Sequence, residues 1–299
     1  MLKNFNQIEK KVKSENPKTV AVAMAQDTDI LVALEKARSR GFTKAVLTGE
    51  KEKIITILDK TGTDKNKYDI INVAGEKESV EEAISLIREG SAQVLMKGLC
   101  STSVFLKGVL DKQNGLRSEK VISHLAIFES ANYHKLLMMS DAAMNIAPDL
   151  GEKINILENA IEAAHKLGCS EPKVAVISAV EKVDAERIPS SADAAIIAKM
   201  GERKQIKGAI IDGPLAIDNA LSKQSCEVKE LNTPVGGDTD ICLVPNIETG
   251  NVFYKLLTIL GKAKVAGIIL GAKSPIVLTS RTDSDESKYL SILTALKAS

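Results

Sequence analysis

The feature that most constrains the fold of this chain is a regular alternation of short, almost wholly apolar segments with longer amphipathic ones. The strand-like segments are 19–25, 45–49, 70–74, 93–98, 121–129, 173–180, 208–212, 240–245 and 265–271. Strands that are apolar on both faces are typical of parallel sheets covered by helices on both sides. The alternation therefore predicts an α/β protein built on a mainly parallel sheet.

The segments between these strands carry helical patterns. In the segment 154–166 the apolar residues recur at spacings of three and four, on one face of a helix; they are Ile154, Leu157, Ile161 and Ala164. Similar patterns predict helices over 28–40, 80–88, 192–200 and 251–260. Each such helix has one apolar face that can cover the sheet.

A hairpin interrupts the alternation near the middle of the chain. The strand-like segment 121–129 is followed by a second one, 135–139, after the short connection 130–133. Two strands joined so closely pair side by side in opposite directions. We therefore expect one antiparallel element in an otherwise parallel sheet.

A second interruption comes late in the chain, where the strand-like run 276–279 follows 265–271 after a short turn. We expect this run to return the chain to the first part of the fold, with the last helix, 286–298, packed there. The expected organisation is two α/β lobes, residues 1–135 with 276–299, and residues 136–275.

Charge and composition exclude several classes of protein. The 40 basic and 39 acidic residues among the 299 nearly cancel, and aromatic residues make up only 3%. The chain therefore has neither the basic stripe nor the stacking platform expected of a nucleic-acid binder. No apolar run reaches the roughly 18 residues of a membrane span, and the N-terminus has no signal-peptide pattern. We expect neither nucleic acid nor a membrane as a partner.

The cysteines and histidines form no disulfide or metal pattern. The four cysteines, of which Cys100 is the first, are scattered without paired spacing, which predicts reduced thiols and a cytoplasmic protein. The histidines form no H-x-x-x-H pattern, and no Cys/His cluster has zinc spacing. We expect no protein-bound transition metal. With no histidine near it in sequence, Cys100 is expected to be a packing residue rather than a catalytic thiol.

In an open α/β sheet, ligands collect where strands end and helices begin. The first such loop contains Lys97, Gly98, Ser101 and Thr102. A cation, a glycine and hydroxyl groups at a helix start suit a phosphate group, although the Walker A pattern is absent. The alternative is that Ser101 or Ser103 only caps the helix.

Two further loops also follow strand-like segments. One contains Asp141 and Asn145, a polar pair that either binds a ligand or fixes the loop itself. The other contains Asn246 and Gly250, residue types that turn formation explains on its own. The amide of Asn246 also suits neutral hydrogen bonding to a ligand.

The fourth loop, 279–286, lies between a strand-like run and the last helix. Ser284 with acidic residues behind it has the pattern of a helix N-cap. That pattern leaves Arg281 unexplained. A guanidinium beside the hydroxyls of Ser280 and Thr282, just after a strand, is suited to hold a phosphate or a developing oxyanion. We therefore expect this loop to be the centre of the chemistry.

Several segments, taken in order from about residue 18 to the C-terminus, resemble the phosphate acetyl/butyryltransferase family. They are Met96–Thr102, Phe105–Lys107, Ser140–Asp149, Lys207–Leu215, Val244–Asn251 and Pro275–Arg281. The resemblance implies a two-lobed fold similar to the isocitrate and isopropylmalate dehydrogenases, with a cleft between the lobes. It also implies a homodimer or a higher homo-oligomer.

The resemblance further implies an acyltransferase. Its reaction moves a short-chain acyl group, butyryl in the branch of the family that the chain matches best, reversibly between coenzyme A and phosphate by direct attack in a ternary complex. Butyryl-CoA, CoA, phosphate and butyryl phosphate are then substrates and products, and no cofactor is needed.

The catalytic residues implied by the resemblance lie in the fourth loop. Ser280 and Arg281 assist the acyl carbonyl and the phosphate. In the acetyl-transferring relatives, an aspartate at the position of Ser287 deprotonates the CoA thiol, and a serine is a poor base. Asp283 is our first choice for this role because it lies nearer the Ser-Arg pair, and Glu286 is the second.

The implied substrate-binding residues are spread over the other loops. They are Lys97, Gly98, Ser101, Thr102, Lys107, Asp141, Asn145, Asn246 and Gly250. Lys107 stands where the acetyl enzymes commonly have arginine, so we expect it to contact phosphate as a point charge.

Three other interpretations stay open: a phosphate acetyltransferase, a metal- and NAD-dependent dehydrogenase of the same fold that acts on a different anionic substrate, and a non-catalytic module that binds CoA or an acyl phosphate.

Overall fold

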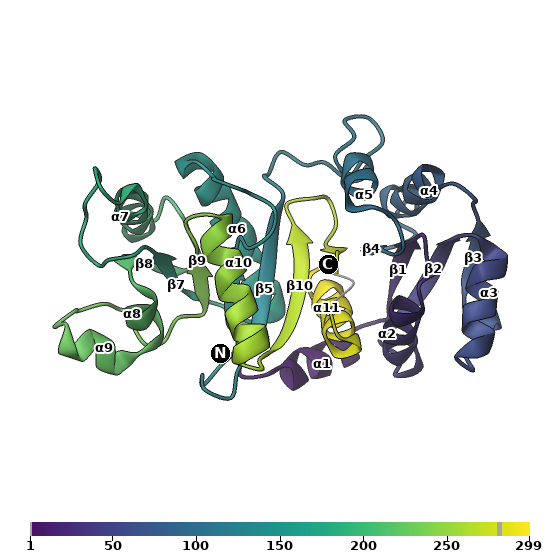
Figure 1. Ribbon diagram of the computed structural model, residues 1–299, viewed down its shortest axis with the longest axis horizontal. Helices are drawn as coiled ribbons and strands as arrows, with labels where there is room; N and C mark the ends of the chain where they lie inside the picture. Colours follow the sequence, from purple (N-terminus) through teal and green to yellow (C-terminus); the bar gives the residue numbers. More distant parts are fainter. Residues whose placement is uncertain (1, 280–282) are drawn as a thin grey trace. The chain divides into compact units, whose positions relative to one another are not determined.

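The computed structural model describes residues 2–279 and 283–299 and shows an α/β protein (Figure 1). The chain divides into two compact units. The terminal unit comprises Asn6–Lys120 and Ala266–Ser299, and the central unit comprises Val121–Val265 with the chain up to Phe5. Each unit contains a set of adjacent strands and helices of its own.

The terminal unit is built on mainly parallel strands. In the order in which they lie side by side, they are β3 (Asp69–Asn72), β2 (Thr43–Gly49), β1 (Lys18–Ala23), β4 (Val94–Lys97), β11 (Ile276–Val277) and β10 (Lys264–Leu270). Neighbours run parallel, except that β10 and β11 are antiparallel. All of β4 and most of β1 are buried, as their apolar runs predict.

Several helices belong to the terminal unit. They are α1 (Phe5–Lys13), α2 (Thr28–Ser39), α3 (Lys51–Lys60), α4 (Glu76–Arg88), α5 (Thr102–Val109) and α11 (Asp285–Ala298), with a 3₁₀ turn at Lys65–Lys67. The last helix, α11, packs against α2, as the sequence predicts. It is also fixed to the strands, because the Gly267 N–H donates to the Ser291 hydroxyl at 2.9 Å. At its C-terminal end, the ammonium of Lys18 donates to the carbonyl of Leu296 at 2.9 Å.

The central unit contains the predicted hairpin. Its strands, in spatial order, are β5 (Ser123–Glu129), β6 (Leu137–Ser140), β9 (Ile241–Leu243), β7 (Lys173–Ile177) and β8 (Ile210–Leu215). Strands β5 and β6 pair antiparallel, with Ala126 opposite Met139, and the other neighbours run parallel. The expected antiparallel element is therefore confirmed. Its core includes Phe128, Met139 and Cys242.

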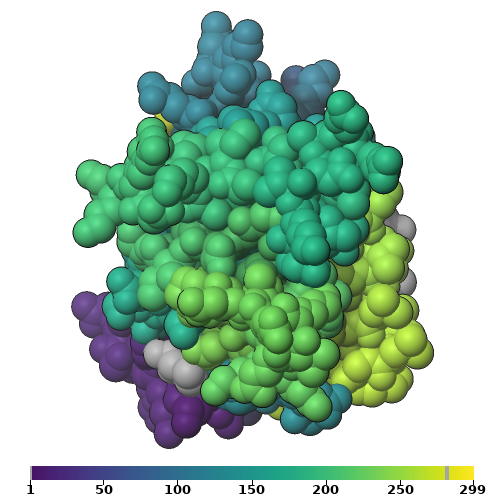
Figure 2. Space-filling model, turned by 90° about the vertical axis from the view of Figure 1, so that its left-hand side faces the viewer, coloured from purple at the N-terminus to yellow at the C-terminus, as the bar shows by residue number. Residues whose placement is uncertain are grey.

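The helices of the central unit are α6 (Leu150–Leu167), α7 (Pro189–Glu202), α8 (Ile217–Leu221), α9 (Lys223–Val228) and α10 (Ile247–Lys255), which continues as a π-helical turn, Leu256–Leu260. Side chains of α7, α8 and α9, in shades of green, cover much of the face of this unit in Figure 2. Helix α6 starts with a capping box between Asp149 and Glu152 and ends at Gly168, whose φ of 101° favours glycine.

No helix within residues 2–279 and 283–299 combines the length and the apolar character that a membrane crossing requires. The division into lobes at 135/136 and 275/276, expected from the sequence, stays a prediction. The compact units divide earlier, after Lys120 and after Val265. The boundary after Lys120 lies before the expected 135/136 boundary because both strands of the hairpin pair within the central unit.

A charge network holds the starts of the central strands together. The ammonium of Lys135, whose side chain is 2% exposed, lies 2.9 Å from the carboxylate of Asp238 and 2.8 Å from that of Asp240. Asp238 also accepts from Lys173 and from the ring of His134, each at 2.8 Å. Partial burial alone would raise the pKa of the Asp238 carboxyl. The hydrogen bonds from Lys173, His134 and Lys135 outweigh burial and hold this pKa well below its usual range.

This network predicts an acid-sensitive share of the stability. Asp238→Asn should lower the free energy of unfolding at pH 7 by about 1–3 kcal/mol, because it removes a partner of a buried ammonium; solvent screening at a one-third-exposed carboxylate keeps the value low. The folded-state pKa lies below the unfolded value of about 4, so this stability is complete above that value and is lost as pH falls below it. Urea unfolding at pH 7, 5 and 3 should show the difference between wild type and variant closing toward pH 3.

A matched control is Asp59→Asn, since Asp59 pairs only loosely with the exposed Lys65 at 3.4 Å. It should leave the unfolding curves almost unchanged. A difference for Asp238→Asn that stays constant over this pH range would contradict the assignment.

Candidate functional site

The parallel strands of each unit end at one edge, which we call the carboxyl edge. In the terminal unit, β1, β4 and β11 lie side by side, and Val277 of β11 is paired with Met96 of β4. The loop after Lys97 and the chain after Thr279 therefore leave the same edge. The start of the fourth loop of the sequence analysis therefore lies at the same edge as the first loop.

The loop after β4 is held tightly to the end of β1. The Gly98 N–H donates to the carbonyl of Ala23 at 2.8 Å, and the Leu99 N–H donates to the carbonyl of Met24 at 2.7 Å. A Cβ atom on Gly98 would lie 2.1 Å from the Met24 oxygen, so a side chain does not fit there. The glycine is therefore required by the close approach of two backbone segments.

The polar groups of this loop are partly used within the fold. Ser101 caps α5, because its hydroxyl accepts the N–H of Val104 at 3.3 Å, and its own N–H donates to the carboxylate of Glu76. The capping alternative is thus realised for Ser101. The ammonium of Lys97, at the buried end of β4, donates to the Gly98 carbonyl at 3.2 Å. Thr102 is exposed in the first turn of α5.

Cys100 lies between these groups and is buried. Burial is the main reason that the pKa of its thiol is raised to about 11, even though the nearby Lys97 ammonium favours the thiolate. A thiol in this state is a poor nucleophile near pH 7. Its surroundings agree with the expectation that Cys100 is a packing residue.

Ser280 and Arg281 lie outside the described residues, as does Thr282. Asp283 follows them and is partly buried. Ser284 is the N-cap of α11 and accepts the N–H of Ser287 at 3.1 Å, as its sequence pattern predicts. Glu286 lies in the first turn of α11 and is exposed.

Lys107 belongs to the helix that follows the Lys97 loop. It is exposed in the last turn of α5, on the helix rather than in the loop that precedes it. Its expected contact with phosphate stays a prediction.

In the central unit, Asp141 and Asn145 mainly fix their own loop. One oxygen of the buried Asp141 carboxylate accepts the N–H groups of Ala143 and Met144, at 2.8 and 3.0 Å. The other accepts the side-chain amide of Asn145 at 2.5 Å, and this amide also donates to the carbonyl of Ile122 at 2.9 Å. These bonds correspond to the loop-fixing alternative for this pair.

The loop after β9 packs directly on the Asp141 loop. A Cβ atom on Gly250 would lie 2.6 Å from the carbonyl oxygen of Asp141 and 2.8 Å from the Cα of Ala142. The Ile247 N–H also donates to the carbonyl of Ile146 at 3.0 Å. Gly250 is needed for this contact, and the second and third loops are therefore neighbours at one edge.

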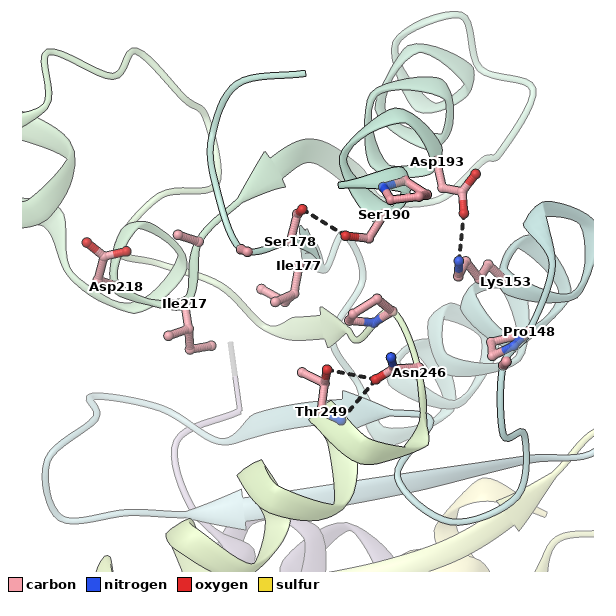
Figure 3. A pocket seen from close by; sticks show the side chains of 15 residues that line it. Pro148, Lys153, Ile177, Ser178, Ser190, Asp193, Ile217, Asp218, Asn246 and Thr249 are labelled. Carbon is pink, nitrogen blue, oxygen red and sulfur yellow. Dashed lines mark hydrogen bonds and ion pairs between the residues drawn. The ribbon is translucent and has the colours of Figure 1, made fainter. Parts of the chain in front are cut away.

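A pocket of about 800 Å³ opens at the carboxyl edge of the central unit, beside the ends of β7, β8 and β9 (Figure 3). Prolines, alanines and two isoleucines form much of its wall. The polar side chains used in the argument below are Lys153, Ser178, Ser190, Asp193, Asn246 and Thr249. A pocket of this volume, lined by both apolar and polar side chains, is typical of a site for a small organic ligand.

Asn246 combines two functions at this pocket. Its side-chain oxygen accepts the N–H and the hydroxyl of Thr249, at 3.0 and 2.7 Å, and so caps α10. This fixes the side chain so that its amide nitrogen points into the cavity (Figure 3). Asn246 therefore offers a donor to a ligand.

The opposite wall contains residues that the sequence analysis missed. The ammonium of Lys153 on α6 pairs with the carboxylate of Asp193 on α7 at 2.6 Å, and the hydroxyls of Ser178 and Ser190 lie 3.0 Å apart (Figure 3). Ser178 directly follows β7, and the end of a parallel strand is a position where ligands often bind. Lys153 and Asp193 carried no such signal, because the first borders a helical pattern and the second lies inside one.

The lining of the pocket suits a ligand with apolar and hydrogen-bonding parts. The first turns of α7 and α10 border it and orient backbone N–H groups toward the carboxyl edge, which favours negative charge. Among the described residues, no group of three or more His, Cys, Asp or Glu side chains is arranged to hold a metal ion.

Comparison with known proteins gives a consistent result. The family model described as phosphate acetyl/butaryl transferase matches residues 76–296. The chain is 46% identical to the phosphate butyryltransferase of Clostridium acetobutylicum over 295 residues, which are 99% of this chain and 98% of the relative. It is also 38% identical to the phosphate acetyltransferase of Thermotoga maritima over 275 residues, 92% of this chain and 93% of the relative.

Solved structures extend the comparison. A branched-chain phosphotransacylase from Enterococcus faecalis V583 is similar with a TM-score of 0.83 and 35% identity, covering 94% of this chain and 98% of that one. A 4-hydroxythreonine-4-phosphate dehydrogenase from Klebsiella pneumoniae shares the fold, with a TM-score of 0.58 and 14% identity over 94% of this chain and 100% of that one. The expected relation to a dehydrogenase fold is therefore confirmed.

Matched over more than half of its length by the family model, and over nearly all of it by the clostridial relative, this chain belongs to the phosphate acetyl/butyryltransferase family of acyltransferases.

Proposed function

We propose that this protein is a phosphate butyryltransferase, which converts butyryl-CoA and phosphate into butyryl phosphate and CoA, and the reverse. The structural observation that carries the proposal is the side-by-side pairing of β4 and β11, which makes the Lys97 loop and the chain up to Thr279, the last described residue before the Ser-Arg pair, leave one edge. The similarity of the whole chain to a phosphate butyryltransferase over 295 residues supports the choice of substrate.

In the direction of butyryl phosphate formation, a phosphate oxygen attacks the carbonyl carbon of the thioester. The carbonyl oxygen becomes an oxyanion, and the C–S bond then breaks to release the CoA thiolate, which takes up a proton. Arg281 carries the charge of the phosphate and the oxyanion, assisted by the Ser280 hydroxyl. Lys97 and the N–H groups at the start of α5 add positive potential at this edge.

In the reverse direction the CoA thiol must lose its proton before it attacks the acyl phosphate. With a pKa above about 8, the thiol is mostly protonated at pH 7, so a base is useful. Asp283 is the proposed base, because it lies only two residues after Arg281 and so nearer the Ser-Arg pair than Glu286 does. Glu286 is less suitable, since it is exposed in the first turn of α11, where an acid stabilises the helix.

The pocket of the central unit is proposed to bind part of the acyl-CoA. Its apolar wall suits the methylene and methyl groups of such a ligand, while Asn246, Ser178 and Ser190 can hydrogen-bond to amide groups. Asp141, Asn145 and Gly250 contribute by fixing the loops around it. Phosphate and CoA act as substrates, and the reaction as written requires no further cofactor. Four buried thiols without disulfides support a cytoplasmic location.

Phosphate acetyltransferase is the alternative, because a relative of that name is 38% identical to this chain. The two activities are separated by release of free thiol from acetyl-, propionyl-, butyryl- and valeryl-CoA on adding phosphate. We expect kcat/KM to be highest for butyryl-CoA. A clear preference for acetyl-CoA would replace the butyryl assignment, and binding of CoA without thiol release would indicate a non-catalytic module.

Asp283 and Glu286 give a matched pair of variants for the base. In the direction that consumes free CoA, Asp283→Asn should lower kcat/KM at pH 7 by about 10²–10⁴-fold, the usual share of general-base catalysis. The deficit should shrink as pH rises toward the pKa of the thiol, because the thiolate then forms without a base. Rates from pH 6 to 9 test this.

Glu286→Gln should keep both the rate and the pH profile of the wild type. The reverse pattern, with Glu286→Gln impaired and Asp283→Asn active, would transfer the role of base to Glu286.

We also propose that the protein is a homo-oligomer, with an apolar stripe on α10 and the following turn in contact with a second copy. Val252, Leu256, Ile259 and Leu260 recur at spacings of four, three and one, and are between 49% and 75% exposed. Such a spacing places them on one face of a helix, and an exposed apolar face of this kind is typical of an interface. Light-green atoms of this segment lie at the surface in Figure 2.

Leu256→Glu with Leu260→Glu should therefore convert the oligomer into monomers. Sedimentation equilibrium over a range of concentrations measures this, and Val228→Glu, at an exposed valine on α9, is the matched control. An unchanged mass for the double variant would place the interface elsewhere, and a monomeric wild type would refute the oligomer.

A further inference from the structure

We propose that Ser79, in the first turn of α4, is a positioning residue for the Lys97 loop. The inference rests on the proposed function, in which Lys97 adds positive potential for the phosphate. Ser79 acts through the end of β1. Its hydroxyl accepts the backbone N–H of Met24 at 2.9 Å, and the carbonyl of Met24 accepts the N–H of Leu99 at 2.7 Å. Met24 therefore connects the serine to the loop.

The turn at Met24 is the part of this connection that needs support. Its φ of 53° lies in the left-handed region, which costs free energy for a residue with a side chain. Around this turn, the carbonyls of Ala23 and Met24 accept the N–H groups of two successive loop residues, Gly98 at 2.8 Å and Leu99 at 2.7 Å. The hydrogen bond from the Met24 N–H to Ser79 offsets part of the cost and holds the turn in the conformation that the loop requires.

The hydroxyl of Ser79 is not explained by the helix in which it lies. Ser79 is completely buried, and the other buried residues of α4 are all apolar. Alanine is a better helix former than serine, and burying a hydroxyl is costly unless the hydroxyl is hydrogen-bonded. Here the hydroxyl accepts the N–H of Met24 and lies 2.8 Å from the hydroxyl of Thr48, which is also completely buried. The serine therefore serves the end of β1 rather than α4.

Thr48, in β2, supports the same turn from another element. Its hydroxyl lies 2.8 Å from the hydroxyl and from the carbonyl oxygen of Ser79, and its backbone carbonyl accepts the N–H of Ala25 at 2.9 Å. The Ala25 N–H and the Met24 carbonyl belong to one planar peptide group and point in opposite directions. Holding this N–H on β2 therefore directs the carbonyl toward Leu99.

A second residue of the same helical turn holds the far end of the loop. The carboxylate of Glu76 accepts the backbone N–H of Ser101, the residue that caps α5. The first turn of α4 thus binds the chain at Met24, which holds the start of the loop, and at Ser101. A loop fixed at both ends before substrate arrives needs less ordering when it binds an anion, which lowers the entropic cost of binding.

Ser79→Ala tests the first step, from the serine to the loop. The backbone N–H groups of Gly98 and Leu99 should exchange with deuterium about tenfold faster than in the wild type, the scale of one lost hydrogen bond. Hydrogen exchange of a peptide that contains residues 97–104, followed by mass spectrometry, measures this without any substrate. Exchange at the wild-type rate would overturn the inference.

Steady-state kinetics test the second step, from the loop to the phosphate. Ser79→Ala should raise KM for phosphate about tenfold, less than the roughly 100-fold of a misplacement of about 1 Å. KM for butyryl-CoA should stay within about twofold of wild type, because a loop displacement at the phosphate acts on one substrate. Equal changes in both KM values would indicate a general structural effect and would overturn the inference, as would an unchanged KM for phosphate.

Ser291→Ala is the matched control. Ser291 is also a buried helical serine of the terminal unit, and its hydroxyl also accepts a backbone N–H at 2.9 Å, that of Gly267 in β10. It should lower the melting temperature about as much as Ser79→Ala, while exchange of residues 97–104 and KM for phosphate stay at wild-type values. The same rise in KM for both serine variants would show a general effect of lost stability and would contradict the role of Ser79.

Lys97→Met reports on the proposed function alone. An unchanged KM for phosphate in this variant, together with faster exchange in Ser79→Ala, would keep the hydrogen-bonded connection and refute the function proposed for Lys97. If Ser79→Ala does not fold, Ser79→Cys takes its place under the same criteria, because a thiol of similar size is a weaker acceptor. Failure of both variants to fold would identify Ser79 as a folding residue and overturn the inference.

Discussion

The pairing of β11 with β4 is the contact on which the proposed chemistry of the terminal unit depends. Strand β11 has only two residues, and both are completely buried. Ile276 is paired with Leu95 of β4 and with Ile269 of β10, and Val277 is paired with Met96 of β4. The residues before it strengthen the register, because the Leu95 N–H donates to the carbonyl of Pro275 at 3.3 Å and the Ser274 hydroxyl donates to the carbonyl of Gln93 at 2.8 Å. The chain returns to β4 after more than 170 residues and pairs with it in a fixed register. Two loops that are distant in sequence therefore start at the same edge of the strands.

In both units, the polar residues at the carboxyl edge fall into two groups. Ser101 and Asp141 use their side chains to cap a helix or close a turn, and Asn145 completes the second of these loops. Lys153 and Asn246 instead lie in the wall of a pocket, and Asn246 caps a helix with its oxygen while its nitrogen faces the cavity. Loops at strand ends must satisfy their own backbone groups before they can bind a ligand. Many polar residues of such a site therefore hold its loops in place and are not available to bind a ligand.

The same distinction explains how far the sequence could predict the molecule. Strands, the hairpin and the packing of the last helix followed from apolar periodicity, because burial on two faces leaves a direct pattern in the chain. Strand ends then indicated the loops of both edges. What the sequence could not show was which hydroxyls and carboxylates are consumed locally, since an N-cap serine and a ligand-binding serine have the same residue type. Lys153 was missed because it stands beside a helical pattern like any surface lysine, and only its contact with Asp193 distinguishes it.

Strand β9 shows how the central unit separates stability from binding. Its three residues, Ile241–Leu243, are buried and connect two different environments. Before the strand, Asp238 and Asp240 surround the buried ammonium of Lys135, so that charges there are neutralised by close partners. After it, Asn246 presents an uncharged donor to an open pocket. A buried charge is tolerated only where geometry is fixed by several contacts, whereas a binding edge must accept ligands that come and go. Placing the charge network at the opposite end of the strands keeps its strong interactions from competing with a ligand for the groups at the carboxyl edge.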